Sequence, residues 1–249
     1  MNAPARFLAT LGFLSRLAPA RVLPEDDLKR AMFHLPLCGL VIGAFAAAPA
    51  ALGLLTGRPL LQAWLTVGLL GWLTRGLHLD GLSDVADAAA SHVEPERFWT
   101  IIKDSRCGAF GVAALVLALS GQILLFSEML RTGAWWAVIW AAVFGRACAV
   151  IFGLTARSHA RPGLGGLFLA GAKLPAAAWA IVAACAPALW LRPFAALWAV
   201  AAALVLLTPL RRLVSAAQGV NGDFLGAAIT LGEIAAGLGY ALATAPPNP

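Results

Sequence analysis

Three aspartates, Asp80, Asp84 and Asp87, are spaced so that a single helix would present all of them on one face. With about 100° of rotation per residue, their side chains point within about 60° of one another. Three like charges arranged in this way repel each other. Because carboxylate oxygens are hard ligands that suit Mg²⁺, the spacing predicts that these side chains hold a catalytic magnesium ion. A solvated acidic helix end is the simpler alternative.

His78 precedes the aspartates by two residues. On a continuous helix it would lie about 160° from Asp80, on the opposite face. Gly81 offers a break that would change this relation. His78 is therefore a candidate proton acceptor or phosphate contact, and an interfacial histidine bonded to the backbone is the alternative.

A second polar segment, residues 101–111, precedes a long apolar stretch. Its Lys103 and Arg106 are suited to bind phosphate oxygens. Asp104 would either complete a metal site or orient Arg106. A polar turn before a membrane helix, with Arg106 at the lipid headgroups, explains the same residues equally well.

Further basic residues follow the next apolar stretch. Arg157 and Arg161 are one helical turn apart and could clamp a phosphate together, with His159 between them. Alternatively, the segment is a basic loop of the kind that fixes membrane orientation. Arg146 differs from these residues because it lies within an apolar run, where an arginine needs an acidic or phosphate partner.

A third polar segment, residues 218–233, contains the turn signal Asn221-Gly222 and then Asp223. Asp223 is placed to cap the last helix, or to serve as a further metal or substrate ligand together with Asn221. Glu233 falls within that helix, where a buried carboxylate paired with an arginine is one interpretation.

The elements that must position these residues are membrane helices. The chain has 249 residues, of which 61% are hydrophobic and 12% charged, which is too apolar for an ordinary soluble domain. We expect one all-α integral membrane domain over residues 1–249, with about seven transmembrane helices. Residues 1–31 are predicted to form an N-terminal interfacial segment, and residues 243–249 a mobile tail. The apolar stretches run roughly over residues 32–55, 60–79, 107–130, 134–156, 174–191, 194–210 and 224–242.

The basic residues are distributed unevenly between the two sides of this arrangement. Of the eighteen Lys and Arg residues, thirteen would lie on one side and only Arg58, Arg131 and Arg192 on the other, with Arg75 and Arg146 left inside helices. The positive-inside rule then places the thirteen in the cytoplasm. We therefore expect a multi-pass protein of the inner membrane whose polar site faces the cytoplasm. The net charge of +6 is attributed to this topology, and no nucleic acid partner is expected.

Together these segments resemble the cobalamin synthase family, whose members are adenosylcobinamide-GDP ribazoletransferases. The family pattern H-L-D-G-L-A-D-x-x-D-G is similar to residues 78–88, I-M-[RK]-D-S-R-x-G to residues 101–108, and T-G-D-x-L-G-A to residues 221–227. Residues 157–165 and 13–17 are similar to the family's basic stretch and opening. The chain departs from the pattern at Ala88, Asn221 and Thr230, where the family has Gly, Thr and Glu.

The resemblance implies the final assembly step of cobalamin. The 5′-hydroxyl of α-ribazole, or its 5′-phosphate, would attack the phosphorus attached to cobinamide in adenosylcobinamide-GDP, and GMP would leave. Mg²⁺ held by the aspartates would bridge the diphosphate, and Lys103, Arg106 and Arg157 would neutralise the remaining oxygens. A CDP-alcohol phosphotransferase, a prenyl-diphosphate transferase and a membrane transporter are the alternatives.

Overall fold

A computed structural model of the chain describes residues 2–21, 23–91 and 94–244, except for the side chains of residues 190 and 191. The described residues form eleven α-helices and one 3-10 turn, so the predicted all-α class is confirmed. In chain order the helices are α1 (Ala3–Leu14), α2 (Glu25–Ala51), α3 (Pro59–Leu73), α4 (Leu77–Ala89), α5 (Pro95–Ile102), α6 (Ala109–Arg131), α7 (Trp135–Ala156), α8 (Leu164–Ala170), α9 (Leu174–Leu191), α10 (Pro193–Ala216) and α11 (Gly222–Thr244), with the 3-10 turn at Arg157–His159 between α7 and α8.

Five of these helices, α2, α6, α7, α10 and α11, are long and apolar enough to cross a membrane. A sixth candidate is the pair α8 and α9, which is bent by 85° at the break between them. Helix α3 is apolar, but its 15 residues make it only about 22 Å long, which is less than the thickness of the hydrocarbon core. Each of the seven predicted apolar stretches contains a helix. Because the described residues include five or six candidate spans, the predicted number of about seven is approximate.

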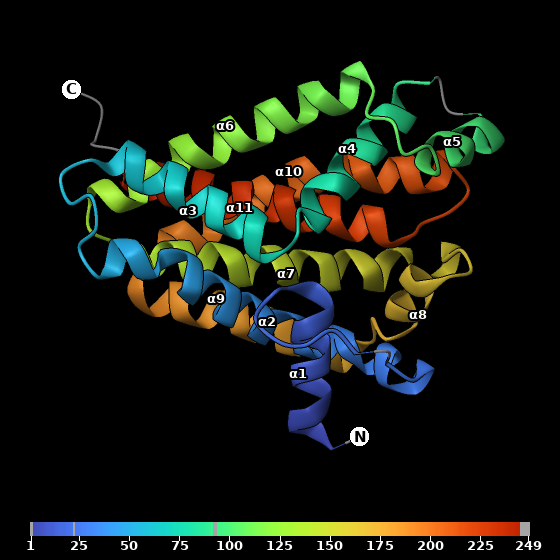
Figure 1. Ribbon diagram of the computed structural model, residues 1–249, viewed down its shortest axis with the longest axis horizontal. Coiled ribbons are helices and arrows are strands. Elements are labelled where there is room, and N and C mark those ends of the chain that lie inside the picture. Colours follow the sequence, from blue (N-terminus) through green and yellow to red (C-terminus); the bar gives the residue numbers. More distant parts are fainter. Residues whose placement is uncertain (1, 22, 92–93, 245–249) are drawn as a thin grey trace.

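Helix α7 is the central helix of the bundle (Figure 1). Within its apolar window 83% of the residues are buried inside the protein, against 22% for α6 and 28% for α10, which leave most of their surface to lipid. Small residues allow α7 and α11 to approach closely. A Cβ atom on Gly145 of α7 would lie 2.6 Å from the carbonyl oxygen of Ile229 of α11, so no larger residue fits there without a shift.

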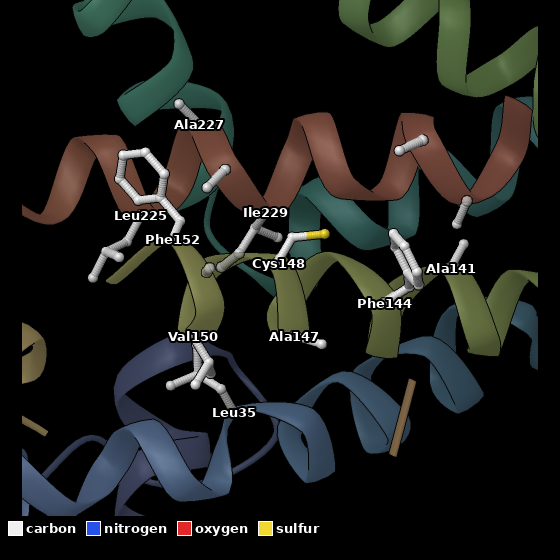
Figure 2. Close-up of a cluster of buried hydrophobic side chains, with 14 of the residues drawn as sticks. Leu35, Ala141, Phe144, Ala147, Cys148, Val150, Phe152, Leu225, Ala227 and Ile229 are labelled. Carbon is white, nitrogen blue, oxygen red and sulfur yellow. The ribbon is translucent and has the colours of Figure 1, made fainter. Parts of the chain in front are cut away.

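The core packs on two sides of α7. Figure 2 shows Phe152 and Cys148 beside Leu225 and Ile229 of α11, and Val150 on the other side, near Leu35 of α2. All of these side chains are buried. Because lipid is as apolar as these residues, close packing rather than the exclusion of water holds α7 between its neighbours.

The polar elements gather at one end of the bundle. The N-terminal ends of α6 and α11 and the C-terminal ends of α7 and α10 meet there with α4, α5 and α8, at the right of Figure 1. The connections α2–α3, α6–α7 and α9–α10 lie at the opposite end. This is the arrangement that the uneven distribution of basic residues predicts.

The N-terminal region contains more helix than the sequence suggested. Helix α2 begins at Glu25, so the predicted interfacial segment over residues 1–31 includes its first turns as well as α1. Helix α1 is joined to α2 by the ion pair between Arg6 Nε and Asp27 Oδ1, at 2.7 Å. At the other terminus, α11 continues to Thr244, and residues 245–249 of the predicted tail lie outside the described residues.

Candidate active site

The predicted helix over residues 60–79 is interrupted between α3 and α4. The N–H of Gly76 donates to the carbonyl oxygen of Gly71 at 2.8 Å, and the N–H of Arg75 to that of Trp72 at 3.2 Å. These are the two closing bonds of a Schellman C-cap. Arg75 takes the left-handed position with a φ of 55°, which costs a non-glycine residue about 1 kcal/mol. The expectation that Arg75 lies inside a helix is therefore wrong.

Arg75 and Arg16 connect the ends of α1 and α3 to each other. Arg75 Nη1 donates to the carbonyl oxygens of Gly12 and Phe13 at the end of α1, at 3.2 and 3.4 Å. In return, the backbone N–H of Arg16 donates to the carbonyl oxygen of Leu73 at the end of α3, at 2.8 Å. Each helix end thus receives donors for carbonyl groups that its own turns leave unbonded. The two contacts place α1 against the start of α4.

Helix α4 crosses the start of α11 at very short range. A Cβ atom on Gly81 would lie 2.7 Å from the backbone oxygen of Asp223, and one on Gly226 would lie 3.2 Å from the Cα atom of His78. The first of these glycines has no larger substitute unless the helices move apart. The crossing brings Asp223 to the same end of the bundle as Asp80, although 143 residues separate them in the sequence.

A buried polar network lies below this crossing. Arg146 of α7 is 1% exposed, and its Nη1 forms an ion pair with Oε1 of Glu233 on α11. Glu233 Oε2 accepts a hydrogen bond from Gln122 Nε2 of α6 at 2.7 Å. Arg146 thus has the acidic partner that its buried position requires. The interpretation of a buried arginine–carboxylate pair is the one observed, and the contact of Arg146 with substrate stays a prediction.

His78 joins this network from α4. Its Nδ1 lies 3.5 Å from Nη2 of Arg146, and its Nε2 is buried without a hydrogen-bond partner among the described residues. Burial, with a smaller contribution from the charge of Arg146, holds the pKa of His78 well below its usual value. The imidazole is therefore neutral, and it supports α4 from the bundle side.

Asp80 and Asp84 line a polar cavity of about 430 Å³ above the network. Burial, followed by the charges of the neighbouring carboxylates, raises the pKa of Asp84 to about 6. The smaller contribution from Asp80 and Asp87 is the repulsion that the one-faced spacing predicted. The other lining residues come from the end of α1, the turn before α4, α4 itself, residues 105–107 and α6: Phe13, Thr74, Arg75, Gly76, Leu77, Ser83, Ser105, Cys107 and Leu115.

Asp87 has a different environment from the other two aspartates. Its Oδ2 accepts a hydrogen bond from the backbone N–H of Gly108, and its Oδ1 one from that of Gly111, both at 2.7 Å. Asp87 therefore caps the start of α6, where the helix dipole also favours a negative charge. Among the described residues, no three His, Cys, Asp or Glu side chains are close enough to hold a metal ion alone.

The predicted basic residues surround the polar end but do not line the acidic cavity in the described part of the chain. Lys103 is exposed, and Arg106 Nη2 pairs with Asp104 Oδ2 at 2.7 Å, which lowers the pKa of Asp104 to about 2. The alternative in which Asp104 orients Arg106 is the one observed. Arg157 Nη1 donates to the carbonyl oxygen of Ala172 at 3.3 Å.

His159 and Arg161 help to join two loops. The N–H of Arg161 donates to the carbonyl oxygen of Val220 at 2.9 Å, and the N–H of Val220 donates to that of His159 at the same distance. The Arg161 guanidinium lies over the ring of Trp99, 4.4 Å from its centroid, in a cation–π arrangement. The segment that follows α7 is thereby fixed beside the start of α11.

A second cavity, of about 350 Å³, lies beside these paired loops. Asn221, Asp223 and His78 line it, together with residues 162–166. The Asn221 side chain accepts a hydrogen bond from the N–H of Asp223 at 3.2 Å and donates one to Asp223 Oδ2 at 2.6 Å. Asn221 therefore provides the side-chain cap at the start of α11, and the interpretation of Asp223 as that cap is wrong. Its alternative role as a metal or substrate ligand stays a prediction.

Several lining residues were not selected from the sequence. Ser83 lies on α4 between two of the aspartates, and its Oγ is 3.1 Å from Cys107 Sγ. Ser105 and Cys107 belong to the predicted segment over residues 101–111, but no charge distinguished them. In the sequence, Gly76 is the one signal that a helix ends near Arg75.

These features define a multi-pass membrane protein with a carboxylate-lined cavity at one end of its helical bundle. A sequence profile of cobalamin-5-phosphate synthase matches residues 6–241, so the chain belongs to this family. It is 44% identical over 93% of each chain to a protein of Nitratidesulfovibrio vulgaris strain Miyazaki F named adenosylcobinamide-GDP ribazoletransferase. Proteins of the same name from Thiobacillus denitrificans and Klebsiella pneumoniae strain 342 are 38% and 36% identical, over 92% of this chain and 92% and 96% of their own. No solved structure matches.

Proposed function

We propose that this chain is an adenosylcobinamide-GDP ribazoletransferase, the transferase that joins α-ribazole or its 5′-phosphate to adenosylcobinamide-GDP and releases GMP. Membership of the family and the names of the similar proteins support this activity. The structural observation that carries it is the cavity in which Asp80 and Asp84 lie next to the crossing of α4 and α11. The family match covers nearly the whole chain and therefore disfavours the CDP-alcohol, prenyl-diphosphate and transporter alternatives.

The carboxylates of this cavity fit Mg²⁺. Magnesium sites on phosphate substrates use one or two carboxylates, completed by phosphate oxygens and water, so Asp80 and Asp84 suffice as protein ligands. When bound, the ion would neutralise the diphosphate and stabilise the leaving GMP. To act as a third ligand, as predicted, Asp87 would have to bind the ion while its two oxygens accept hydrogen bonds from the start of α6.

The basic residues have different roles in this proposal, according to which cavity they lie near. Arg75 shares the cavity with Asp80 and Asp84 and is placed to neutralise a phosphate oxygen. Lys103 and Arg106 lie within two residues of Ser105, which lines the same cavity, and their proposed role is to contact the donor at the mouth of that cavity. The roles proposed for Arg157, His159 and Arg161 are to hold the loop beside the second cavity and to give that surface a positive charge.

The experiment that tests the function is GMP release by the purified protein with adenosylcobinamide-GDP, α-ribazole and varied Mg²⁺. Asp80→Asn and Asp84→Asn should each lower turnover about a hundredfold or more, because each removes a charge from the metal site. Asp26→Asn is the matched control, since Asp26 is an exposed aspartate of α2 whose ion-pair partner among the described residues is Lys29. Absence of GMP release from the wild type would refute the activity. Normal turnover in both cavity variants would refute the metal site.

The exposed thiol of Cys107 gives an independent readout of the same cavity. Adenosylcobinamide-GDP with Mg²⁺ should slow the reaction of Cys107 with a maleimide, because the bound donor covers it. A labelling rate that does not respond to donor, in a protein that releases GMP, would place the donor elsewhere.

We further propose that the protein lies in the inner membrane with its polar end in the cytoplasm, from the uneven distribution of Lys and Arg. In a Cys107→Ser background, which removes the exposed native thiol, cysteines introduced by Ser91→Cys and Pro59→Cys, at opposite ends of the bundle, should react with a membrane-impermeant maleimide from opposite sides of sealed vesicles. Labelling of both positions from one side would contradict this topology.

A further inference from the structure

The second cavity adjoins the acidic one. Phe13 and Leu77 line both cavities, so the two spaces share a wall formed by the end of α1 and the start of α4. A volume of about 350 Å³ lies within the range of small-molecule sites. The catalytic roles proposed above do not use this second space.

The walls of the second cavity are mainly apolar. Phe13 and Phe168 both line it, with ring centroids 5.2 Å apart and planes tilted by 32°. Leu14, Leu35 and Ile229 add aliphatic surface. The segment 162–166 also lines the cavity, with backbone at three glycines and with the side chains of Pro162 and Leu164. A flat ring that enters this cavity meets aromatic and aliphatic walls, which favour a planar apolar group.

The polar groups of the cavity are concentrated where α11 begins. Asn221 and Asp223 line it there, and Asp223 is the residue whose backbone touches Gly81 of α4. Gly81 follows Asp80, which lines the acidic cavity. A ligand with an apolar ring and a polar tail therefore has one orientation in which its tail points toward the acidic cavity.

We propose that the second cavity binds the aromatic base of the acceptor nucleoside, with the ribose directed toward Asn221 and Asp223. This inference rests on the proposed function and assigns the binding site of its acceptor. The benzimidazole base of ribazole carries little polarity on its edge and matches the apolar walls. Guanine, the base of the donor, would lose hydrogen bonds for its several edge donors and acceptors against the same walls. The two substrates thus enter separate cavities and react at the crossing of α4 and α11.

Two thiols test this assignment directly. Leu164 lines the second cavity and is 58% exposed, so Leu164→Cys, combined with Cys107→Ser, places a reactive thiol at its rim. Saturating α-ribazole should slow maleimide labelling of this thiol several-fold and leave wild-type Cys107 unaffected. Adenosylcobinamide-GDP with Mg²⁺ should produce the opposite pattern. Protection of the rim thiol by the donor alone, or by neither compound, would overturn the assignment.

Steady-state kinetics provide the second test. A Cβ atom on Gly222, which lines the cavity, would lie 3.8 Å from the Cα atom of Gly165, an ordinary contact, with no closer atom from other described segments. Gly222→Leu should therefore fold and reduce the space for the acceptor at the end of the cavity where the ribose is proposed to lie. We expect the KM for α-ribazole to rise about tenfold or more, with the KM for the donor within about twofold of wild type. Gly121→Leu on α6 is the matched control, because a Cβ atom there meets nothing within 4 Å.

The possible outcomes separate this inference from the proposed function. A wild type that releases no GMP refutes the function itself. A wild type that turns over, together with an unchanged ribazole KM in Gly222→Leu, refutes only the acceptor site. A rise in the donor KM alone would assign the cavity to the guanosine of the donor and overturn the inference.

Discussion

Replacement of Asp87 by asparagine separates two roles that the sequence pattern combined. The three aspartates share one face of α4, and each was expected to bind metal. In the structure, the two oxygens of Asp87 accept hydrogen bonds from the N–H groups of Gly108 and Gly111 at the start of α6. Asparagine offers one oxygen and one amide group, so one of the two backbone N–H groups would then face a donor.

The magnitude follows from these contacts. Losing a hydrogen bond to a charged acceptor costs about 2 kcal/mol, and losing a negative charge at a helix N-terminus costs about 0.5 kcal/mol more. We therefore expect Asp87→Asn to destabilise the protein by about 2–3 kcal/mol. For a chain of this length that change corresponds to a fall in Tm of roughly 5–10 °C.

The assay is thermal unfolding in detergent, with Asp80→Asn as the comparison. Asp80 is exposed, and removing its charge relieves repulsion with Asp84, so this variant should keep or slightly raise the wild-type Tm while losing turnover. An unchanged Tm in Asp87→Asn would refute the capping role. An equal fall in Tm in both variants would mean that the acidic face stabilises the fold as a whole.

Two further predictions concern the elements beneath the cavity. Arg146→Met should destabilise the protein by about 3–5 kcal/mol because it leaves Glu233 buried and charged, and adding Glu233→Leu should restore most of the lost stability. Thermal unfolding of the single and double variants measures both effects. A double variant that is no more stable than Arg146→Met would contradict the prediction. Gly81→Ala should lower turnover because its methyl group pushes α4 away from α11, although alanine is the better helix former by about 1 kcal/mol. Gly121→Ala is its control, and a Gly81→Ala protein with full GMP release would contradict the close crossing.

The membrane class, the apolar helices and the polar end were predictable from the sequence. Hydrophobicity and charge belong to single residues and accumulate along a segment, so composition and the positions of Lys and Arg indicate them without knowledge of any contact. The shared face of Asp80, Asp84 and Asp87 was predictable for the same reason, because the period of one helix determines it.

Partnerships between distant segments required the tertiary structure. Nothing near Arg146 in the sequence indicates whether its acidic partner is Glu233 or a substrate phosphate, because that depends on α7 packing against α11. The helix break before α4 could not be predicted from the sequence for a related reason. An arginine occupies the left-handed position that glycine usually takes, and its contacts with the end of α1 compensate for that choice.

Which residues make up the site also depends on the tertiary structure. Asp87 faces the same way as Asp80, but the start of α6 occupies its oxygens, whereas Asp223 arrives from the far end of the chain. Asp223 lines the cavity next to that of Asp80 and Asp84. How close the two cavities lie depends on how closely α4 and α11 approach, and here that distance is set by Gly81 against the backbone of Asp223. A sequence displays such a glycine, but the neighbour that it admits is determined only when the helices pack.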